Sequence, residues 1–379
     1  MEPFRIAVSD SALADLRRRL GQTRFARPVR QQEPTAWGVG TAPDYLRDLI
    51  EYWATDFDWR ARESQLNSFP QFTADVAGET VHFVYLRAKP TPDDAQPIPV
   101  ILSHGWPYSF IELLALGARL ADPAAHGGQP GDAFDVVIPS LPGFGFSEPM
   151  RDEPFVPRVV AARWHTLMTE VLGYDRYATY GEDVGAPISD WLAARYPEQV
   201  LGLFATHAAF APDERKQDLS AAEVAFTTRL AEKWKGETAY SALQASKPDT
   251  LAATLNDSPA GLAAWLVEKF RGWSGEFESS WTRDEVLTTV MLYWVTETIG
   301  SSFQPYCDHR WDTSIPEIEV PVGVAVHPGE TGFPQSYAAR TYRDIRVWEE
   351  LPSGGHFAGK ETPDLLADRM RTFFRPLRG

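Results

Sequence analysis

The first sixty residues carry hydrophobic side chains at helical spacing. Three leucines follow one another at intervals of three and four residues, which places them on one face of a helix: Leu13, Leu16 and Leu20. Asp10 lies just before this run and can cap the helix. A second helical pattern covers 45–53, and a connector that contains proline and arginine, 26–34, joins the two. Because the segment contains no plausible catalytic constellation, we expect a packing module that covers the catalytic domain.

From residue 79 onward, short apolar segments alternate with amphipathic ones. The segments with strand character are 80–86, 98–103, 134–139, 177–180, 200–205, 320–326 and 345–348. Strands that alternate with helices predict a mostly parallel sheet with helices on both faces. Residues 208–310 interrupt this alternation with helical patterns rich in Ala, Leu and Trp. We therefore expect a helical lid over the C-terminal edge of the strands, where ligands bind in open α/β sheets.

These patterns divide the chain into four segments. An N-terminal helical extension covers 1–78, and the first part of an α/β core covers 79–207. The helical lid covers 208–312, and the second part of the core covers 313–379. This organisation is typical of the α/β-hydrolase fold with a lid insertion.

The composition narrows the class of protein. The 379 residues carry a formal net charge of -16 and no Lys/Arg-rich run, which argues against a nucleic-acid partner. The single cysteine, Cys307, excludes an internal disulfide and fits a reducing compartment. No apolar run is long enough for a signal-peptide core or a membrane helix. We expect a cytoplasmic protein without a membrane anchor.

The pentapeptide Gly-Glu-Asp-Val-Gly at 181–185 is the most informative local signal. A predicted strand precedes it and a predicted helix follows it. The small residues two positions before and after Asp183 allow the tight turn that such a junction needs. This pattern is typical of the nucleophile elbow of α/β-hydrolases, with Asp183 where many of them have serine. Alone it is a weak signal, because aspartate is common in turns and at helix N-caps.

Further groups follow in the order nucleophile, acid, histidine that is typical of this fold. His356 lies in a glycine-containing loop between the last predicted strand and the final predicted helix. Glu330 follows the strand 320–326, and it would orient His356 and stabilise its charged form. Asp308 is a weaker candidate for the same role.

The segment His-Gly-Trp-Pro at 104–107 directly follows a predicted strand and predicts an oxyanion hole. The backbone N–H groups of Trp106 and Val184 would hold a developing oxyanion. We expect His104 to shape this loop through hydrogen bonds rather than to take part in the chemistry. The predicted site needs no metal and no other cofactor.

An aspartate nucleophile indicates displacement at saturated carbon. A serine that attacks such a carbon leaves an ether, which water does not readily cleave. A carboxylate leaves an ester, which water activated by His356 can hydrolyse while the oxyanion hole stabilises the tetrahedral intermediate. Epoxides and alkyl halides are the two common substrates that meet this requirement.

The chain resembles the epoxide hydrolases of the α/β-hydrolase superfamily, in the branch similar to microsomal epoxide hydrolase. The resemblance covers nearly the whole chain. Its most specific stretches are 4–20 in the N-terminal extension, His-Gly-Trp-Pro at 104–107, and 246–251 and 257–265 in the lid. Several family members carry a membrane anchor, which we expect this chain to lack.

The resemblance implies that two lid tyrosines, Tyr240 and Tyr306, donate hydrogen bonds to the epoxide oxygen. A phenol can hydrogen-bond the alkoxide that forms on ring opening and then protonate it. The chain departs from the branch at Glu182, usually Gly, and at Val184, often Trp. A second carboxylate facing Asp183 would raise the pKa of the nucleophile, so we expect the Glu182 side chain to point away.

The sequence therefore predicts an enzyme that converts a small apolar epoxide and water into a vicinal diol through an ester on Asp183. Aromatic residues near the motifs predict an apolar substrate pocket: Trp106, Phe144, Phe210 and Phe357. A haloalkane dehalogenase is the alternative, because it shares the aspartate elbow, the histidine and the lid. Such enzymes commonly hold the halide with a Trp directly after the nucleophile, which here is Val184. A catalytically silent binding protein of the same fold is a further alternative. We expect a homodimer.

Overall fold

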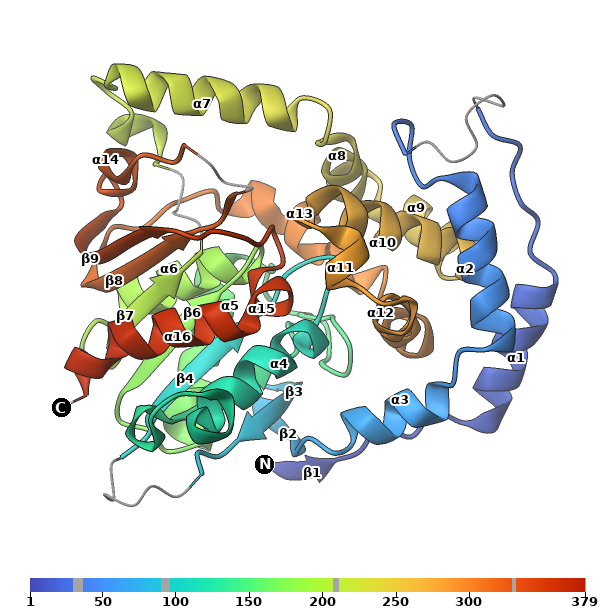
Figure 1. The fold of residues 1–379 in the computed structure, drawn as a ribbon, viewed down its shortest axis with the longest axis horizontal. Coiled ribbons are helices and arrows are strands. Elements are labelled where there is room, and N and C mark those ends of the chain that lie inside the picture. The colour runs from blue at the N-terminus through green and yellow to red at the C-terminus, as the bar shows by residue number, and fades with distance from the viewer. Residues whose placement is uncertain (30–36, 90–95, 207–210, 329–331, 379) are drawn as a thin grey trace.

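The computed structural model describes residues 1–29, 37–89, 96–206, 211–328 and 332–378. In this part of the chain, nine strands form one central sheet in the order β1-β2-β3-β5-β4-β6-β7-β8-β9 (Figure 1). The strands are β1 (Glu2–Phe4), β2 (Gln71–Val76), β3 (Glu79–Leu86), β4 (Ile98–Ser103), β5 (Phe134–Pro139), β6 (Tyr177–Gly181), β7 (Val200–Ala205), β8 (Ile318–Val326) and β9 (Tyr342–Glu350). Neighbours from β5 to β9 are parallel, and the pairs that join β1, β2, β3 and β5 are antiparallel. The predicted mostly parallel sheet is confirmed.

Two of the strands, β1 and β2, were not predicted. β1 has only three residues. β2 forms a hairpin with β3 through Ala77 and Gly78, both of which have positive φ (56° and 91°). Two-residue hairpins of this kind usually carry Asn-Gly or Asp-Gly, because both positions need a positive φ. Here the first position is alanine, which rarely adopts that conformation, so the sequence carries no hairpin signal. The segment 1–78 thus contributes two strands to the sheet as well as helices.

Helices cover both faces of the sheet. α4 (Phe110–Ala121) packs with α16 (Pro363–Phe374) on one face, and α5 (Pro157–Thr166) packs with α6 (Gly185–Arg195) on the other (Figure 1). Two short helices, α14 (Gln335–Ala338) and α15 (Ala358–Glu361), belong to the second half of the core. This layering places the β6–α6 junction at the carboxyl edge of the central strands.

A helical insertion separates β7 from β8, as the sequence predicts. Its helices are α7 (Ala221–Trp234), α8 (Ala239–Ser246), α9 (Pro248–Leu255), α10 (Pro259–Trp273), α11 (Phe277–Ser280), α12 (Arg283–Thr296) and α13 (Gln304–Asp308). Figure 1 shows α8 to α13 grouped beside the carboxyl ends of the central strands. The chain has the α/β-hydrolase fold with its helical insertion.

The extension contains α1 (Asp10–Gly21), α2 (Pro43–Thr55) and α3 (Trp59–Leu66), and its first two helices pack against α10 of the lid. Polar contacts support this packing: Arg19 forms an ion pair with Asp257 (2.8 Å), and the Tyr52 hydroxyl donates to Asp284 (2.8 Å). The predicted cap of α1 is wrong. Ser9, whose backbone is extended, accepts the hydrogen bond from the Ala12 N–H, because Asp10 is already the first helical residue.

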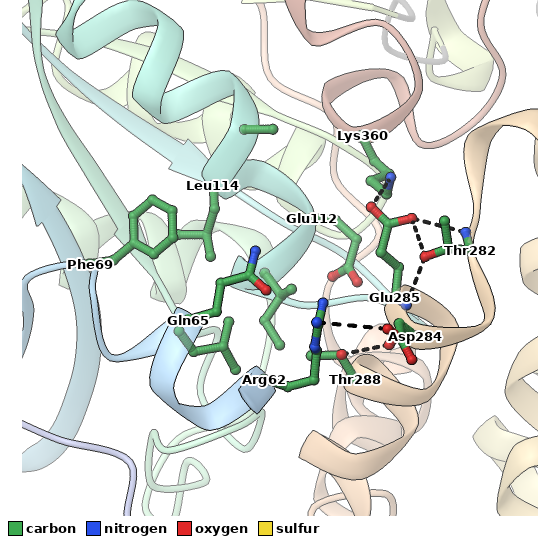
Figure 2. A pocket seen from close by; sticks show the side chains of 13 residues that line it. Arg62, Gln65, Phe69, Glu112, Leu114, Thr282, Asp284, Glu285, Thr288 and Lys360 are labelled. Atoms are coloured by element: carbon green, nitrogen blue, oxygen red, sulfur yellow. Dashed lines mark hydrogen bonds and ion pairs between the residues drawn. The ribbon is translucent and has the colours of Figure 1, made fainter. Parts of the chain in front are cut away.

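A cavity of about 460 Å³ lies where the extension, α4 and α12 meet (Figure 2). Two ion pairs line it: Arg62 with Asp284 (3.7 Å), and Lys360 with Glu285 (2.8 Å). Lys360 lies in α15, close to His356 in sequence, and also donates to the carbonyl of Ser280 (2.9 Å). These contacts attach α15 to the lid.

Asp190, inside α6, is a buried carboxyl group that makes the stability of the fold depend on pH. It is 5% exposed, and Tyr342 donates a hydrogen bond to it (3.0 Å). Burial raises the pKa of Asp190 from 3.8 to about 7. The folded state therefore holds the proton more tightly than the unfolded chain, and Asp190 costs stability as pH rises from about 4 to 7.

Replacement of this carboxyl should remove that cost. We expect the stability of Asp190→Asn, relative to wild type, to improve by roughly 2 to 3 kcal/mol between pH 5 and pH 8. Asparagine keeps an oxygen acceptor for Tyr342. Urea unfolding of both proteins at the two pH values measures the change. A difference in unfolding free energy that is the same at both would contradict the prediction.

Candidate active site

The turn between β6 and α6 presents Asp183 with a positive φ of 50°. Glycines on both sides permit this turn. A Cβ atom on Gly181 would lie 2.1 Å from the carbonyl oxygen of Gly185, and one on Gly185 would lie 2.2 Å from that of Ser103. Both approaches are too close for a side chain, so the two glycines of the predicted elbow meet a steric requirement.

Two backbone N–H groups bond the Asp183 carboxylate. The Trp106 N–H donates to Oδ1 (2.9 Å), and the Val184 N–H also bonds the carboxylate. A Cβ atom on Gly105 would lie 2.4 Å from the same oxygen, so glycine is required for the loop to approach. Burial alone would raise the pKa of Asp183, but the interaction with His356 and these two N–H groups lower it overall. Asp183 is therefore ionised at neutral pH.

His356 lies against the other oxygen of this carboxylate. Its Nε2 atom is 3.3 Å from Asp183 Oδ2. The loop that carries it is fixed to the end of α10, because the His356 N–H donates to the carbonyl of Trp273 (3.0 Å). The rings of Trp273 and Phe357 pack edge-on against the imidazole, with centroids 5.0 and 5.1 Å away. The structure thus brings together the predicted nucleophile and the predicted base.

Glu330 and Asp308 are the two candidates for the triad acid, and only Asp308 lies within the described residues. Glu330 lies outside the described residues. Asp308, the weaker candidate, ends α13, and its Oδ2 accepts a hydrogen bond from the Phe155 N–H (2.8 Å). That contact joins the lid to the segment before α5, which is a structural role.

The two lid tyrosines meet above Trp106. Tyr240, in α8, stacks on the Trp106 indole (5.3 Å, 9° between planes), and Tyr306, in α13, packs on it edge-on (5.9 Å). The tyrosine rings also contact each other, with centroids 5.8 Å apart. Burial and then the negative charge of Asp183 raise the pKa of both phenols. Both hydroxyls therefore stay protonated and can donate hydrogen bonds toward the nucleophile.

The aromatic residues predicted for the pocket have different surroundings. Trp106 and Phe357 are fully buried in the cluster around Asp183 and His356, whereas Phe144 packs on His104 (5.3 Å). Phe210 lies outside the described residues. Sequence reasoning missed Trp273, whose ring contacts both Trp106 and His356. No local motif marks this residue, because a Trp at the end of an amphipathic helix is an ordinary packing residue.

His104 fixes the loop that carries Trp106. It is fully buried, and its Nε2 accepts a hydrogen bond from the Leu141 N–H (3.0 Å). Its Nδ1 lies 3.0 Å from the carbonyl of Gly105. Burial lowers the pKa of His104 to about 4, so the ring is neutral at pH 7 and donates from Nδ1.

The described ranges contain no group of three or more His, Cys, Asp or Glu side chains arranged to hold a metal ion. No helix in them is long and apolar enough to span a bilayer.

Known proteins named as epoxide hydrolases are similar to this chain in sequence and in structure. The model of the epoxide hydrolase N-terminus matches residues 1–113, and that of the α/β-hydrolase fold matches 98–313. A protein of Stigmatella aurantiaca, named as an epoxide hydrolase, is 39% identical over 99% of this chain and 85% of its own length. Epoxide hydrolase 1 of Sus scrofa is 31% identical over 98% of this chain and 88% of its own.

Solved structures of epoxide hydrolases are also similar to this chain. Juvenile hormone epoxide hydrolase from Bombyx mori superposes with a TM-score of 0.88 at 26% identity, over 100% of this chain and 94% of that one. The epoxide hydrolase of Aspergillus niger gives 0.86 at 29% identity, over 99% and 96%. With Asp183 in the turn between β6 and α6 and a helical insertion between β7 and β8, the chain belongs to the epoxide hydrolase family of the α/β-hydrolase superfamily.

Proposed function

We propose that the protein hydrolyses an epoxide to a vicinal diol in two steps, with Asp183 as nucleophile and His356 as base. The observation that carries this proposal is the asymmetric environment of the Asp183 carboxylate. Oδ1 accepts a hydrogen bond from the Trp106 N–H, the Val184 N–H bonds the same carboxylate, and Oδ2 faces His356. One carboxylate thus has an oxygen suited to attack and an oxygen placed in an oxyanion hole.

In the first step, Oδ2 of Asp183 attacks an epoxide carbon and the ring C–O bond breaks. The oxygen that leaves the ring develops negative charge. Tyr240 and Tyr306 are protonated donors in the lid, and we assign them to that oxygen, one of them transferring its proton. The product of this step is an ester between the substrate carbon and Oδ2.

In the second step, His356 takes a proton from water and the resulting hydroxide attacks Cγ of Asp183. The ester carbonyl oxygen is Oδ1, so negative charge develops on the oxygen to which the Trp106 N–H already donates, while the Val184 N–H bonds the same group. Collapse of this intermediate releases the diol, whose departing oxygen takes the proton from His356. The second proton of the water, left on Asp183, returns to the tyrosinate, which restores both the carboxylate and the phenol. We propose Glu330 as the acid that orients His356, with Asp308 as the weaker candidate.

The substrate class follows from the surroundings of the nucleophile. The aromatic cluster of Trp106, Trp273 and Phe357 is apolar, which favours an epoxide with an apolar substituent; Phe144 and Phe210 stay predicted lining residues. A cytoplasmic location and a homodimer also stay predictions, and size-exclusion chromatography with light scattering tests the dimer.

One observation supports the alternative function, that of a haloalkane dehalogenase. Trp106 Nε1 is buried without a hydrogen-bond partner in the described part of the chain, so one donor to a halide is present. Val184 offers no side-chain donor as the second. Diol release from an aryl-substituted epoxide, assayed beside halide release from a matched alkyl bromide, tests the proposed function. Halide release without any diol would overturn it.

The lid tyrosines should affect the first step alone. We expect Tyr240→Phe or Tyr306→Phe to slow ester formation by roughly 10- to 10⁴-fold, because the departing oxygen loses a proton donor. Single-turnover mixing followed by intact-protein mass spectrometry measures the rate. Tyr52→Phe, which loses a hydroxyl at the contact between extension and lid, is the control. Ester formation at the wild-type rate in both lid variants would remove these tyrosines from the mechanism.

A further inference from the structure

Glu182, directly before the nucleophile, is a buried carboxyl group without a place in the mechanism above. It is 1% exposed, and burying such a group is costly unless its surroundings compensate. The resemblance to the epoxide hydrolases leads us to expect glycine here. Since the Asp183 carboxylate is held by Trp106, Val184 and His356, Glu182 needs a separate explanation.

The Glu182 side chain reaches toward α15, the helix that follows His356. Its Oε1 accepts hydrogen bonds from the Gly359 N–H (2.7 Å) and from the Tyr180 hydroxyl. A Cβ atom on Gly359 would lie 3.1 Å from the same oxygen and 2.8 Å from a terminal methyl group of Leu113, so a larger residue here would push against both side chains. The carboxyl group therefore anchors the chain three residues after His356.

The loop that carries His356 is held from two sides. On the lid side, the His356 N–H donates to Trp273, and Glu361 accepts a hydrogen bond from the Gly275 N–H (2.8 Å). On the elbow side, Glu182 holds Gly359. The position of the imidazole relative to Asp183 thus depends on a residue adjacent to Asp183 itself, which couples nucleophile and base through one short stretch of backbone.

Charge as well as position links Glu182 to His356. Burial raises the pKa of Glu182 to about 7, while the Tyr180 hydroxyl, the Gly359 N–H and then the positive charge of His356 act to lower it. An imidazolium at 356 and a carboxylate at 182 therefore stabilise each other. Glu182 Oε2 and the Tyr108 hydroxyl are both buried, and Tyr108 also acts to lower the pKa of Glu182. The Tyr108 ring packs edge-on against the imidazole (6.3 Å).

Other titratable groups also face His356. Among the described residues these are Asp183, Glu361 and Tyr108. Asp183 is neutral as an ester during the second step, so its charge is absent when His356 takes a proton. Glu361 is engaged with the Gly275 and Phe357 N–H groups. Glu182 thus becomes one of the remaining negative groups when the imidazolium forms.

We propose that Glu182 is a positioning residue for the hydrolytic step, which fixes the loop of His356 and stabilises the imidazolium formed when His356 takes a proton from water. This inference rests on the proposed function. In that step a water O–H bond breaks, its proton goes to Nε2 of His356, and the oxygen bonds to Cγ of Asp183. The departing diol oxygen then takes the proton from His356. Glu182 exchanges no atom in this sequence.

Glu182→Gln separates charge from position, because glutamine keeps an oxygen acceptor for Gly359 and Tyr180. Ester formation and ester hydrolysis are measured separately in single turnovers at pH 6 and pH 8. We expect ester formation at the wild-type rate. Hydrolysis should be close to wild type at pH 6, where Glu182 is mostly protonated, and about three- to tenfold slower at pH 8, since a less stabilised imidazolium makes a weaker base.

Asp190→Asn is the matched control. Asp190 is also a buried carboxyl that accepts a tyrosine hydroxyl, and its pKa is also raised to about 7, but its hydrogen bond goes to Tyr342. Both of its steps should match wild type at both pH values. If Glu182→Gln slows hydrolysis equally at pH 6 and pH 8, slows ester formation as well, or changes neither step, the inference is wrong. Absence of an ester in the wild type would instead overturn the proposed function.

Tyr180→Phe provides a second test that leaves the carboxyl group in place. Loss of the phenol removes the strongest hydrogen bond that favours ionised Glu182. In wild type, ester hydrolysis should become faster than in Glu182→Gln as Glu182 ionises with rising pH. In Tyr180→Phe this change should therefore occur at a higher pH. If Glu182→Gln does not fold, the hydrolysis profile of Tyr180→Phe against wild type decides: a midpoint shifted to higher pH supports the inference, and an unchanged midpoint overturns it.

Discussion

His356→Gln should stop the reaction after its first step and accumulate the ester on Asp183. Attack by Oδ2 on an epoxide needs no base, because Asp183 reacts as its carboxylate, and the Trp106 and Val184 N–H groups still favour that form when His356 is replaced. Hydrolysis of the ester needs a group that takes a proton from water, and glutamine cannot do so. Intact-protein mass spectrometry after mixing with an epoxide should show the protein mass increased by one substrate, with no further diol.

Two controls define this result. Asp183→Ala, mixed in the same way, should show neither adduct nor turnover, because no nucleophile remains. Wild type at the same times should show a small adduct fraction that disappears as substrate is consumed. If His356→Gln binds the epoxide but stays unmodified, the two-step scheme is wrong.

Local sequence was sufficient to predict the elbow and the sheet around it. The turn at Asp183 requires glycine at 181 and 185 for reasons that lie within a few residues and the adjacent strand. Apolar runs predicted the core strands β3 to β8, because burial on both faces of a sheet leaves a strong hydrophobic signal. β9 is only partly buried, and the sequence predicted residues 345–348 of it. The lid was predicted as an insertion because the strand pattern stops and later resumes.

The features that the sequence did not predict depend on contacts between residues far apart in the chain. The ring of Trp273 contacts His356 only because the end of α10 meets the loop after β9. The N-terminal helices were expected to cover the catalytic domain, yet α1 and α2 pack on α10 of the lid. Glu182 was expected to point away from Asp183, and its hydrogen bonds go to Gly359 and Tyr180. The burial of this carboxyl behind the histidine loop could not be read from a pentapeptide.

The origin of the added oxygen provides the sharpest test of Asp183 as nucleophile. In a single turnover with excess enzyme in heavy-oxygen water, we expect the first diol to be unlabelled. Its new oxygen should be Oδ2, since Oδ1 stays bound to the Trp106 N–H. Water then replaces Oδ2, so the label should appear in the peptide that contains Asp183. Mass spectrometry of the diol and of a protease digest measures both.

Direct attack by activated water predicts the opposite distribution. If His356 delivered hydroxide to the epoxide carbon, the first diol would carry the label and the Asp183 peptide would not. That route gives no role to the backbone N–H groups of Trp106 and Val184 that bond the Asp183 carboxylate, because no oxyanion forms on Asp183. In the covalent route the same donors stabilise the tetrahedral intermediate. A labelled first diol would therefore falsify the ester mechanism while leaving the hydrolysis of epoxides in place.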